Sequence, residues 1–99
     1  MKELHVMNKD GDLLRAYALG DGAEIIVGRE ESCDVQILAR SVSREHCIIE
    51  SAEGKAVLRD LKSSGGTFVD GKEIDEVELT HGMEFIIGPA VIRFYDEQD

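Results

Sequence analysis

The amino-acid sequence predicts an all-β fold, an antiparallel β-sandwich or barrel made of short strands. Three observations support this class. Apolar and polar residues alternate over short stretches, which is the period of a half-buried strand. Turn signals rich in Gly, Asn and Asp separate these stretches at short intervals. No window keeps apolar residues at helical spacing for three turns, which argues against a helical fold.

The expected strands follow one another with a turn signal between most of them. The segment "NKDGD" joins the first two as a hairpin, "AEGK" joins a second pair, and Asp70-Gly71 favours a tight primed turn. In order, the expected strands cover residues 3–8, 13–19, 23–28, 34–38, 46–51, 55–61, two very short pieces within 66–74, then 77–79, 81–88 and 90–97.

Length and composition indicate one globular domain over residues 1–99, with 42% hydrophobic and 32% charged residues. The acidic end, residues 96–99, is expected to form a frayed tail. No apolar run approaches the roughly 20 residues that cross a bilayer, and the N-terminus lacks the apolar core of a secretory signal. We therefore expect a cytoplasmic domain, one part of a longer polypeptide, with no membrane association.

The charge balance argues against nucleic acid as a partner. The chain carries 21 acidic and 11 basic residues, a net charge of −10. Such a charge repels a phosphate backbone, so we expect no DNA or RNA binding. Any anion that the chain binds must be held by a local cluster of donors.

The cysteines and histidines predict no metal or cofactor. Cys33 and Cys47 are too few for a disulfide framework, and they lack the spacing of metal ligands. The three histidines are scattered along the chain. Cys47, within "HCIIE", is expected to be a small buried hydrophobe, whereas the loop position of Cys33 leaves its environment open.

Three loops carry side chains that plain turns do not need. They begin at Gly28-Arg29, at "ARSVSREH" (residues 39–46) and at "LKSSGGTF" (residues 61–68). Guanidinium groups offer a bidentate fork, and hydroxyls and glycine N–H groups donate without adding bulk, so together they form a phosphate-binding set. Its members are Arg29, Arg40, Arg44, Lys62, Ser41, Ser43, Ser63, Ser64, Thr67, Gly65 and Gly66.

Four segments in order resemble one known family. "VGR", "SVSREH", "RDLKSSGGTFVDG" and "LTHGMEFIIG" are similar to the motifs of the forkhead-associated (FHA) domain, and the resemblance spans about residues 25–94. It implies an FHA/SMAD-like β-sandwich of about eleven short strands. It also implies a phosphothreonine-reading module that mediates phosphorylation-dependent protein–protein interaction in signalling, through loops at one end and without catalysis.

The resemblance assigns roles to individual residues. Arg29 and Ser43 would be the direct phosphate ligands, Arg44 would lie along the phosphopeptide, and Ser64 would be a further hydroxyl near the phosphate. Gly65 stands where the family's asparagine grips the main chain of the ligand. The remaining motif residues would be structural: Gly28, His46 (whose ring ties neighbouring loops together), Gly66, Thr67, Asp70 and Gly71.

The sequence departs from the family pattern at three positions. Gly65 has no side chain to contact a peptide, and we expect Gly65→Asn to strengthen binding by restoring that hydrogen bond. Asp70 replaces a second asparagine; it suits a turn, but an ionised carboxylate cannot donate. Met83 stands where the pattern has aspartate, with Glu84 following it.

Plainer interpretations compete with these roles. Ser43 would cap a turn, Arg44 would pair with Glu45 or Asp34, and "SSGG" would be a flexible turn. A Ser43–His46 nucleophile and base lacks a third member, so we expect no enzyme.

The alternative function is a phosphate-independent scaffold or self-assembly domain with the same fold. The expected partner is a phosphothreonine-containing protein or peptide, bound by a monomeric domain.

Overall fold

The computed structural model describes residues 1–97, which form eleven β-strands and no helix. Each expected stretch overlaps one of these strands, and residues 66–74 hold two of them, so the all-β prediction is confirmed. The strands are β1 (Lys2–Met7), β2 (Leu13–Ala18), β3 (Glu24–Gly28), β4 (Val35–Gln36), β5 (Cys47–Ala52), β6 (Lys55–Asp60), β7 (Phe68–Val69), β8 (Lys72–Glu73), β9 (Glu76–Leu79), β10 (Glu84–Ile87) and β11 (Ala90–Asp96).

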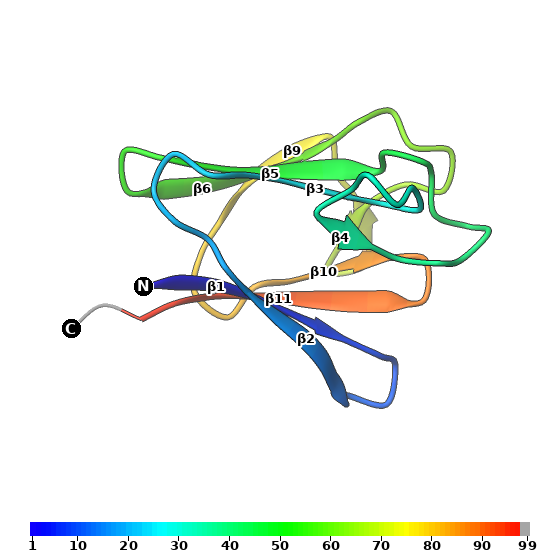
Figure 1. Cartoon of the computed structure of the whole chain (residues 1–99), viewed down its shortest axis with the longest axis horizontal. Helices are drawn as coiled ribbons and strands as arrows, with labels where there is room; N and C mark the ends of the chain where they lie inside the picture. The colour runs from blue at the N-terminus through cyan, green and yellow to red at the C-terminus, as the bar shows by residue number, and fades with distance from the viewer. Residues whose placement is uncertain (98–99) are drawn as a thin grey trace.

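The strands form two sheets that stack as the layers of a sandwich (Figure 1). One sheet has the order β2-β1-β11-β10-β7-β8, and the other has the order β4-β3-β5-β6-β9. The pairs are antiparallel except for β3 and β4, which run parallel. This exception to the antiparallel prediction arises because residues 29–34 carry the chain back beside the end of β3, where two residue pairs suffice for β4.

Left-handed residues close the tight hairpins. Asp70 and Gly71 between β7 and β8 have φ values of 51° and 78°, which confirms the predicted primed turn. Glu53 and Gly54 between β5 and β6 have φ values of 55° and 78°, the same turn class. Each turn fixes the register of the strand pair that it joins.

The core lies between the two sheets and is built from alternate strand residues. Burying one such aliphatic or aromatic side chain contributes roughly 1.5–3 kcal/mol, so the sandwich is a firm support for its loops. The largest fully buried apolar residues are Phe85, Phe94, Leu4, Ile49, Leu58, Ile87, Ile92, Val27, Val35 and Val42.

The two ends of the described chain are joined. Asp96 is the last residue of β11, the Glu97 amide donates to the Met1 carbonyl over 3.1 Å, and the Met1 ammonium donates to the Glu97 carbonyl over 2.7 Å. The tail expected at 96–99 therefore does not begin at Asp96, and residues 98–99 lie outside the described residues. Within residues 1–97, no helix is long and apolar enough to cross a membrane.

Candidate anion-binding site

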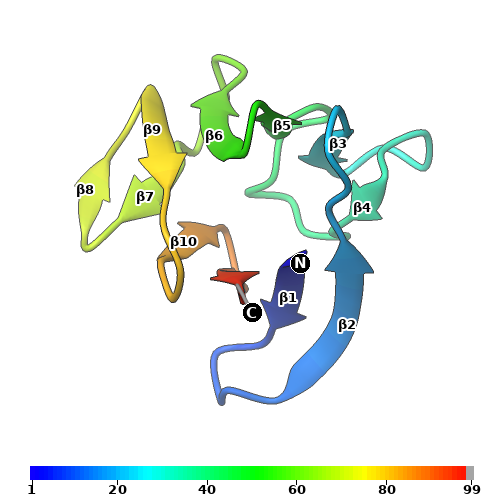
Figure 2. The ribbon, with the colours of Figure 1, turned by 90° about the vertical axis from the view of Figure 1, so that its left-hand side faces the viewer.

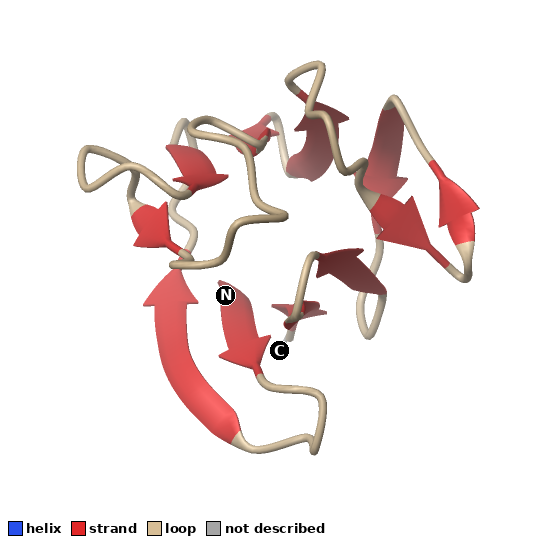
Figure 3. Ribbon diagram, turned by 90° about the vertical axis from the view of Figure 1, so that its right-hand side faces the viewer, coloured by secondary structure: helices blue, strands red, loops and turns tan. Residues whose placement is uncertain are grey.

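Three loops meet at one end of the sandwich, the end that faces the viewer in Figure 3. They are residues 29–34 after β3, residues 37–46 between β4 and β5, and residues 61–67 between β6 and β7. Hydrogen bonds join the second loop to each of the other two, through Arg29 and Ser43 on one side and Ser43 and Ser64 on the other. The candidate residues from three sequence segments are thus brought together.

Gly28 allows the second loop to lie directly on the end of β3. A Cβ atom at this residue would lie 2.1 Å from the Arg44 carbonyl oxygen, closer than any real contact. The backbone amide of Arg29 donates to the Ser43 carbonyl over 3.0 Å, and that of Glu30 donates to the Arg44 carbonyl over 3.2 Å. The backbone of residues 43–44 therefore packs directly against the backbone at the end of β3, and only glycine fits at position 28.

The Arg29 side chain is exposed and held at its inner nitrogen. Its Nε donates to the Val42 carbonyl over 3.0 Å, and the Val42 side chain is fully buried. No acceptor within residues 1–97 bonds the two terminal guanidinium nitrogens. The guanidinium is therefore oriented by the protein, and its two outer nitrogens have no acceptor among residues 1–97.

Two serine hydroxyls bridge the second and third loops. The Oγ atoms of Ser43 and Ser64 lie 3.4 Å apart, and the Ser64 backbone amide donates to Ser43 Oγ over 3.1 Å. Ser64 is exposed and Ser43 is half-buried. The pair thus places two hydroxyl groups on the loops next to the Arg29 loop, and hydroxyls can donate hydrogen bonds to an oxyanion.

His46 joins the same two loops from beneath. Its fully buried ring accepts the Ser43 backbone N–H at Nδ1 over 3.0 Å and contacts the Gly66 carbonyl at Nε2 over 2.8 Å. A carbonyl can only accept, so Nε2 carries the proton. Both nitrogens are used by backbone groups, and neither bonds the Ser43 hydroxyl. This geometry does not support a Ser43–His46 nucleophile and base.

Asp60 organises the third loop, a role that sequence reasoning missed. Its carboxylate accepts the Ser63 amide over 3.0 Å, the Ser63 hydroxyl over 2.6 Å and the Thr67 hydroxyl over 2.8 Å. Partial burial raises the pKa of Asp60, but these hydrogen bonds outweigh it and hold the pKa below its ordinary value. The available signal was an aspartate ending a strand with a serine three residues later, a common side-chain-to-backbone turn.

Gly65 fills a position where the third loop touches the second. A Cβ atom here would lie 2.6 Å from the Ser41 carbonyl oxygen, which belongs to the backbone. This geometry argues against the expectation that asparagine would simply restore a contact at this position, because the Ser41 backbone lies at the place of its Cβ atom. The neighbouring Gly66 has φ of +83°, and a Cβ atom there would lie 3.0 Å from Glu73 Oε2.

The other basic residues of the loops are exposed. Arg44 Nε lies 3.9 Å from Glu30 Oε1, so its ion-pair partner is neither of the two expected carboxylates. Asp34 instead accepts the Ile26 amide over 2.9 Å. Lys62 has φ of 57°, a strained conformation for lysine. The three loops therefore hold four of the basic residues together with four carboxylates, a balance less acidic than that of the whole chain.

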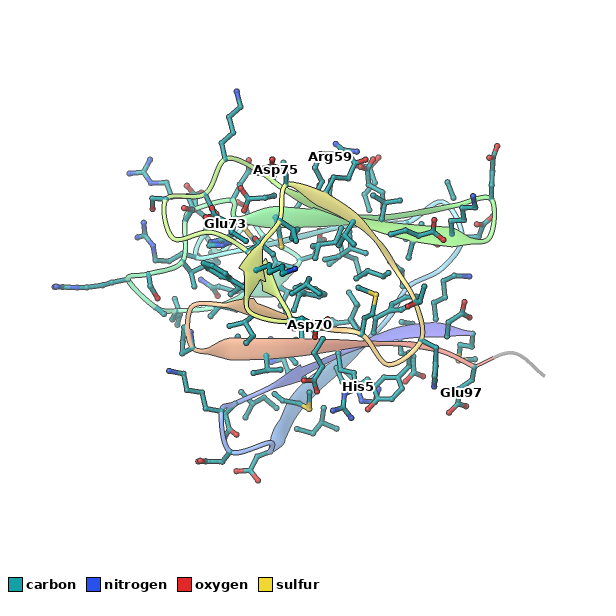
Figure 4. All side chains as sticks on the ribbon, turned by 180° about the vertical axis from the view of Figure 1, so that it is seen from behind. His5, Arg59, Asp70, Glu73, Asp75 and Glu97 are labelled. Carbon is teal, nitrogen blue, oxygen red and sulfur yellow. The ribbon has the colours of Figure 1, made fainter. Side chains whose placement is uncertain are left out.

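Asp70 and Gly71 lie apart from the three loops. They form the turn between β7 and β8, with Glu73 on the adjoining strand (Figure 4). The structure therefore gives them a turn role and no contact with the serine pair. Thr67, by contrast, is fully buried against Asp60 within the third loop.

Both cysteines are buried and free. Cys33 Sγ donates to the Arg44 carbonyl over 3.1 Å, which places it beneath the second loop. Burial raises the pKa of both the Cys33 and the Cys47 thiol, so neither is a thiolate at neutral pH. Among residues 1–97, no three His, Cys, Asp or Glu side chains gather as a metal site would require.

The fold and the three loops define a β-sandwich interaction module with a polar, partly basic loop end. The sequence profile of the FHA domain matches residues 25–88, and the chain belongs to the FHA domain family. FHA domains are interaction modules rather than enzymes.

Individual relatives agree with this assignment. The chain is 38% identical over 73 residues to the human (Homo sapiens) proliferation marker protein Ki-67, which covers 73% of this chain and 2% of Ki-67. It is similar to an FHA domain from an analysis of phosphothreonine-dependent FHA domain interactions, with 28% identity, a TM-score of 0.85, and coverage of 98% and 97% of the two chains. The FhaA FHA domain, solved with the intracellular domain of Rv3910, has 29% identity, a TM-score of 0.82, and coverage of 95% and 99%.

Proposed function

We propose that this chain binds phosphothreonine peptides and so mediates phosphorylation-dependent protein–protein interaction in signalling. The observation that carries the proposal is the anchored guanidinium of Arg29, whose Nε is held by Val42 while its outer edge stays free. Ser43 and Ser64 supply hydroxyls on the adjoining loops. A solved FHA relative that takes part in phosphothreonine-dependent interactions supports the same assignment.

The phosphate would accept hydrogen bonds from the Arg29 fork and from the Ser43 hydroxyl. Such charge-assisted hydrogen bonds are about twice as strong as neutral ones. Arg44 and Lys62, together with Arg40, would attract the dianion against the net charge of −10. Because Gly65 offers no side chain, the peptide main chain would be held by backbone groups of this loop.

The role is binding rather than catalysis. Both ring nitrogens of His46 bond backbone groups, so this imidazole is not placed to activate a serine. We propose a cytoplasmic location alongside a threonine kinase, which agrees with the two free cysteines. The chain spans 2% of the length of Ki-67, and we propose that it likewise serves as one module of a longer protein.

An oriented phosphopeptide library tests the function. The domain is screened at low salt against phosphothreonine, phosphoserine and unphosphorylated versions of each peptide. We expect selected phosphothreonine peptides to bind and their unphosphorylated forms to be ignored. Affinity should fall as salt rises, because screening weakens an attraction built on few local charges. Equal affinities for phosphorylated and unphosphorylated peptides would instead support the phosphate-independent scaffold.

A further inference from the structure

The four edge strands of the two sheets differ in how they are protected. Strands β4 and β8 contain two residues each, and β9 carries Glu76 and Glu78. Strand β2 has six residues, Leu13–Ala18, of which one is charged. Long apolar edges offer unpaired backbone groups to other strands, and proteins normally protect them with charge, proline or short length. Strand β2 is the longest edge of the described chain, and its protection consists of Arg15 and a bulge near Leu14.

The backbone of β2 is paired on one side. Strand β1 is its neighbour in the sheet, and no other strand within residues 1–97 pairs with it. The register shifts between Val6 and Met7, so a bulge bends β2 near Leu14. The opposite edge of β2 therefore presents N–H and C=O groups along most of a strand.

An apolar groove runs along the same edge. It has a volume of about 280 Å³ and lies between β2 and residues 35–38. Figure 2 shows β2 and β4 at neighbouring edges of the two sheets. Its walls include Leu14 and Tyr17 from β2, Leu38 after β4, and Pro89. The side chains of Leu14 and Leu38 are 59% and 80% exposed, so the groove carries two exposed apolar side chains.

A groove beside a free strand edge fits an extended chain better than a compact small molecule. The backbone of an added strand would pair with β2, and its alternate side chains would enter the groove. The charged residues around the β2 edge then indicate which charges the added strand should carry. Asp10 and Asp12 precede β2 and Asp21 follows it, so carboxylates outnumber the one lysine, Lys9, around the ends of the edge, while Arg15 lines the groove between them. The net charge of −10 also opposes a second copy of this chain.

We propose that the β2 edge and its groove bind an extended segment of a partner protein, apolar at alternate positions and basic at both ends. The surface is separate from the Arg29 site. The two are joined by one contact, in which Gln36 of the groove donates to the Arg29 carbonyl over 3.2 Å. The groove contains neither Ser43 nor Ser64, so its occupancy requires no phosphate.

A displayed library of short peptides tests this surface. Each peptide has two lysines at each end and a degenerate centre of Val, Ile, Leu, Tyr and Thr. The library is selected on the wild-type domain, and enriched peptides are measured by fluorescence polarisation. We expect Leu14→Lys and Leu38→Lys each to weaken binding at least about tenfold. Ile86→Lys is the matched control, because Ile86 is 42% exposed and lies outside the groove.

Three further measurements identify the binding mode and separate it from the phosphopeptide site. Methylating alternate peptide nitrogens that face β2 should abolish binding, whereas methylating the other set should not. The same peptides with glutamate at both ends should bind more weakly. A phosphothreonine peptide should neither compete with the strand peptide nor lose affinity in Leu14→Lys, so failure of this proposal is distinguishable from failure of the phosphopeptide site.

Several outcomes would overturn the proposal. The first is that no peptide is enriched, and the second is that enriched peptides bind both leucine variants as well as wild type. The third is concentration-dependent self-association that Leu14→Lys removes, which would assign the edge to a second copy. If Leu14→Lys does not fold, the exposed loop variant Leu38→Lys still decides the question.

Discussion

The carbonyl oxygen of Ser41 lies 2.6 Å from the position that a Cβ atom at Gly65 would take. Two loops distant in sequence are thus packed at backbone distance beside the candidate site. In this structure the Ser41 backbone lies where the first side-chain atom of an asparagine at position 65 would be placed. The pairing of Ser41 with Gly65 explains a departure that the sequence alone presents as a loss.

Gly65→Asn should destabilise the protein and weaken phosphopeptide binding. A side chain here must push the Ser41 backbone away, and such overpacking costs roughly 1–3 kcal/mol. The melting temperature should fall by about 4–8 °C for each kcal/mol in a domain of this size. Gly20→Asn is the control, since Gly20 has open space and no positive φ. Unchanged melting with tighter peptide binding would show that the loops separate easily.

His46→Ala should damage the fold more than any chemistry. Removing the ring leaves the Ser43 amide and the Gly66 carbonyl without partners, and each such buried group costs about 1–3 kcal/mol. Urea unfolding measures the loss, with Lys9→Ala as control, because Lys9 is exposed and its side chain bonds no other group within residues 1–97. Unchanged stability together with lost peptide binding would contradict the structural role.

Local features of the fold were predictable, whereas contacts between loops were not. Strand periodicity and the Asp70-Gly71 turn depend on neighbours in the chain, and both are found as expected. The packing of Gly65 on Ser41 depends on where two loops meet after folding. The same holds for the Glu30 partner of Arg44. Spacing in a sequence carries no signal for such approaches.

The same distinction between local sequence features and contacts formed on folding applies to the candidate site. Its residue types and order were sufficient to group Arg29 with Ser43 and Ser64, because family motifs record which loops converge. The carboxylate of Asp60 was missed because the spacing from Asp60 to Ser63 was not used as a turn signal, and because its bonds to Ser63 and Thr67 shape the loop rather than belong to a recognised ligand set. A phosphate-binding role for the grouped residues remains a prediction until peptides are measured.

The folded protein should lose stability in acid partly through Asp60. Its pKa is held below the ordinary value of 3.8, so its contribution is fully present above that value. The contribution is lost as the pH falls below about 4 towards the folded pKa. Asp60→Asn should be less stable at neutral pH, and the gap from wild type should narrow as the pH falls.

Urea unfolding from pH 7 to pH 3 measures this gap. The exposed Asp10→Asn variant serves as the control, because the Asp10 carboxylate accepts no hydrogen bond within residues 1–97. A gap between wild type and Asp60→Asn that stays constant across the range would mean that the three hydrogen bonds do not depend on the charge of Asp60.

Arg29→Ala should abolish phosphopeptide binding and leave the domain folded. The side chain is exposed, and within residues 1–97 it bonds the protein only through Nε to the Val42 carbonyl, so its loss opens no cavity. A bound phosphate would exclude water from the guanidinium. Losing one partner of such a buried charged pair costs roughly 2–5 kcal/mol. That cost is about thirty- to several-thousand-fold in affinity, enough to take a micromolar complex out of measurable range.

Arg29→Lys should restore little of that affinity, because lysine cannot reproduce the way in which the Arg29 guanidinium is held. The guanidinium donates to Val42 at Nε and still offers two outer nitrogens to a phosphate. A lysine ammonium is a point charge on a flexible stem, and it cannot both hold Val42 and present a fork. Arg59→Ala is the matched control for Arg29→Ala, because each removes one positive charge. Arg59 is paired with Glu50 and Glu76 on another part of the surface. Peptide affinity of the three variants, with melting curves, decides the matter. If Arg29→Ala stays folded and binds within about twofold of wild type, or if Arg59→Ala loses as much affinity, the phosphate site is not at Arg29.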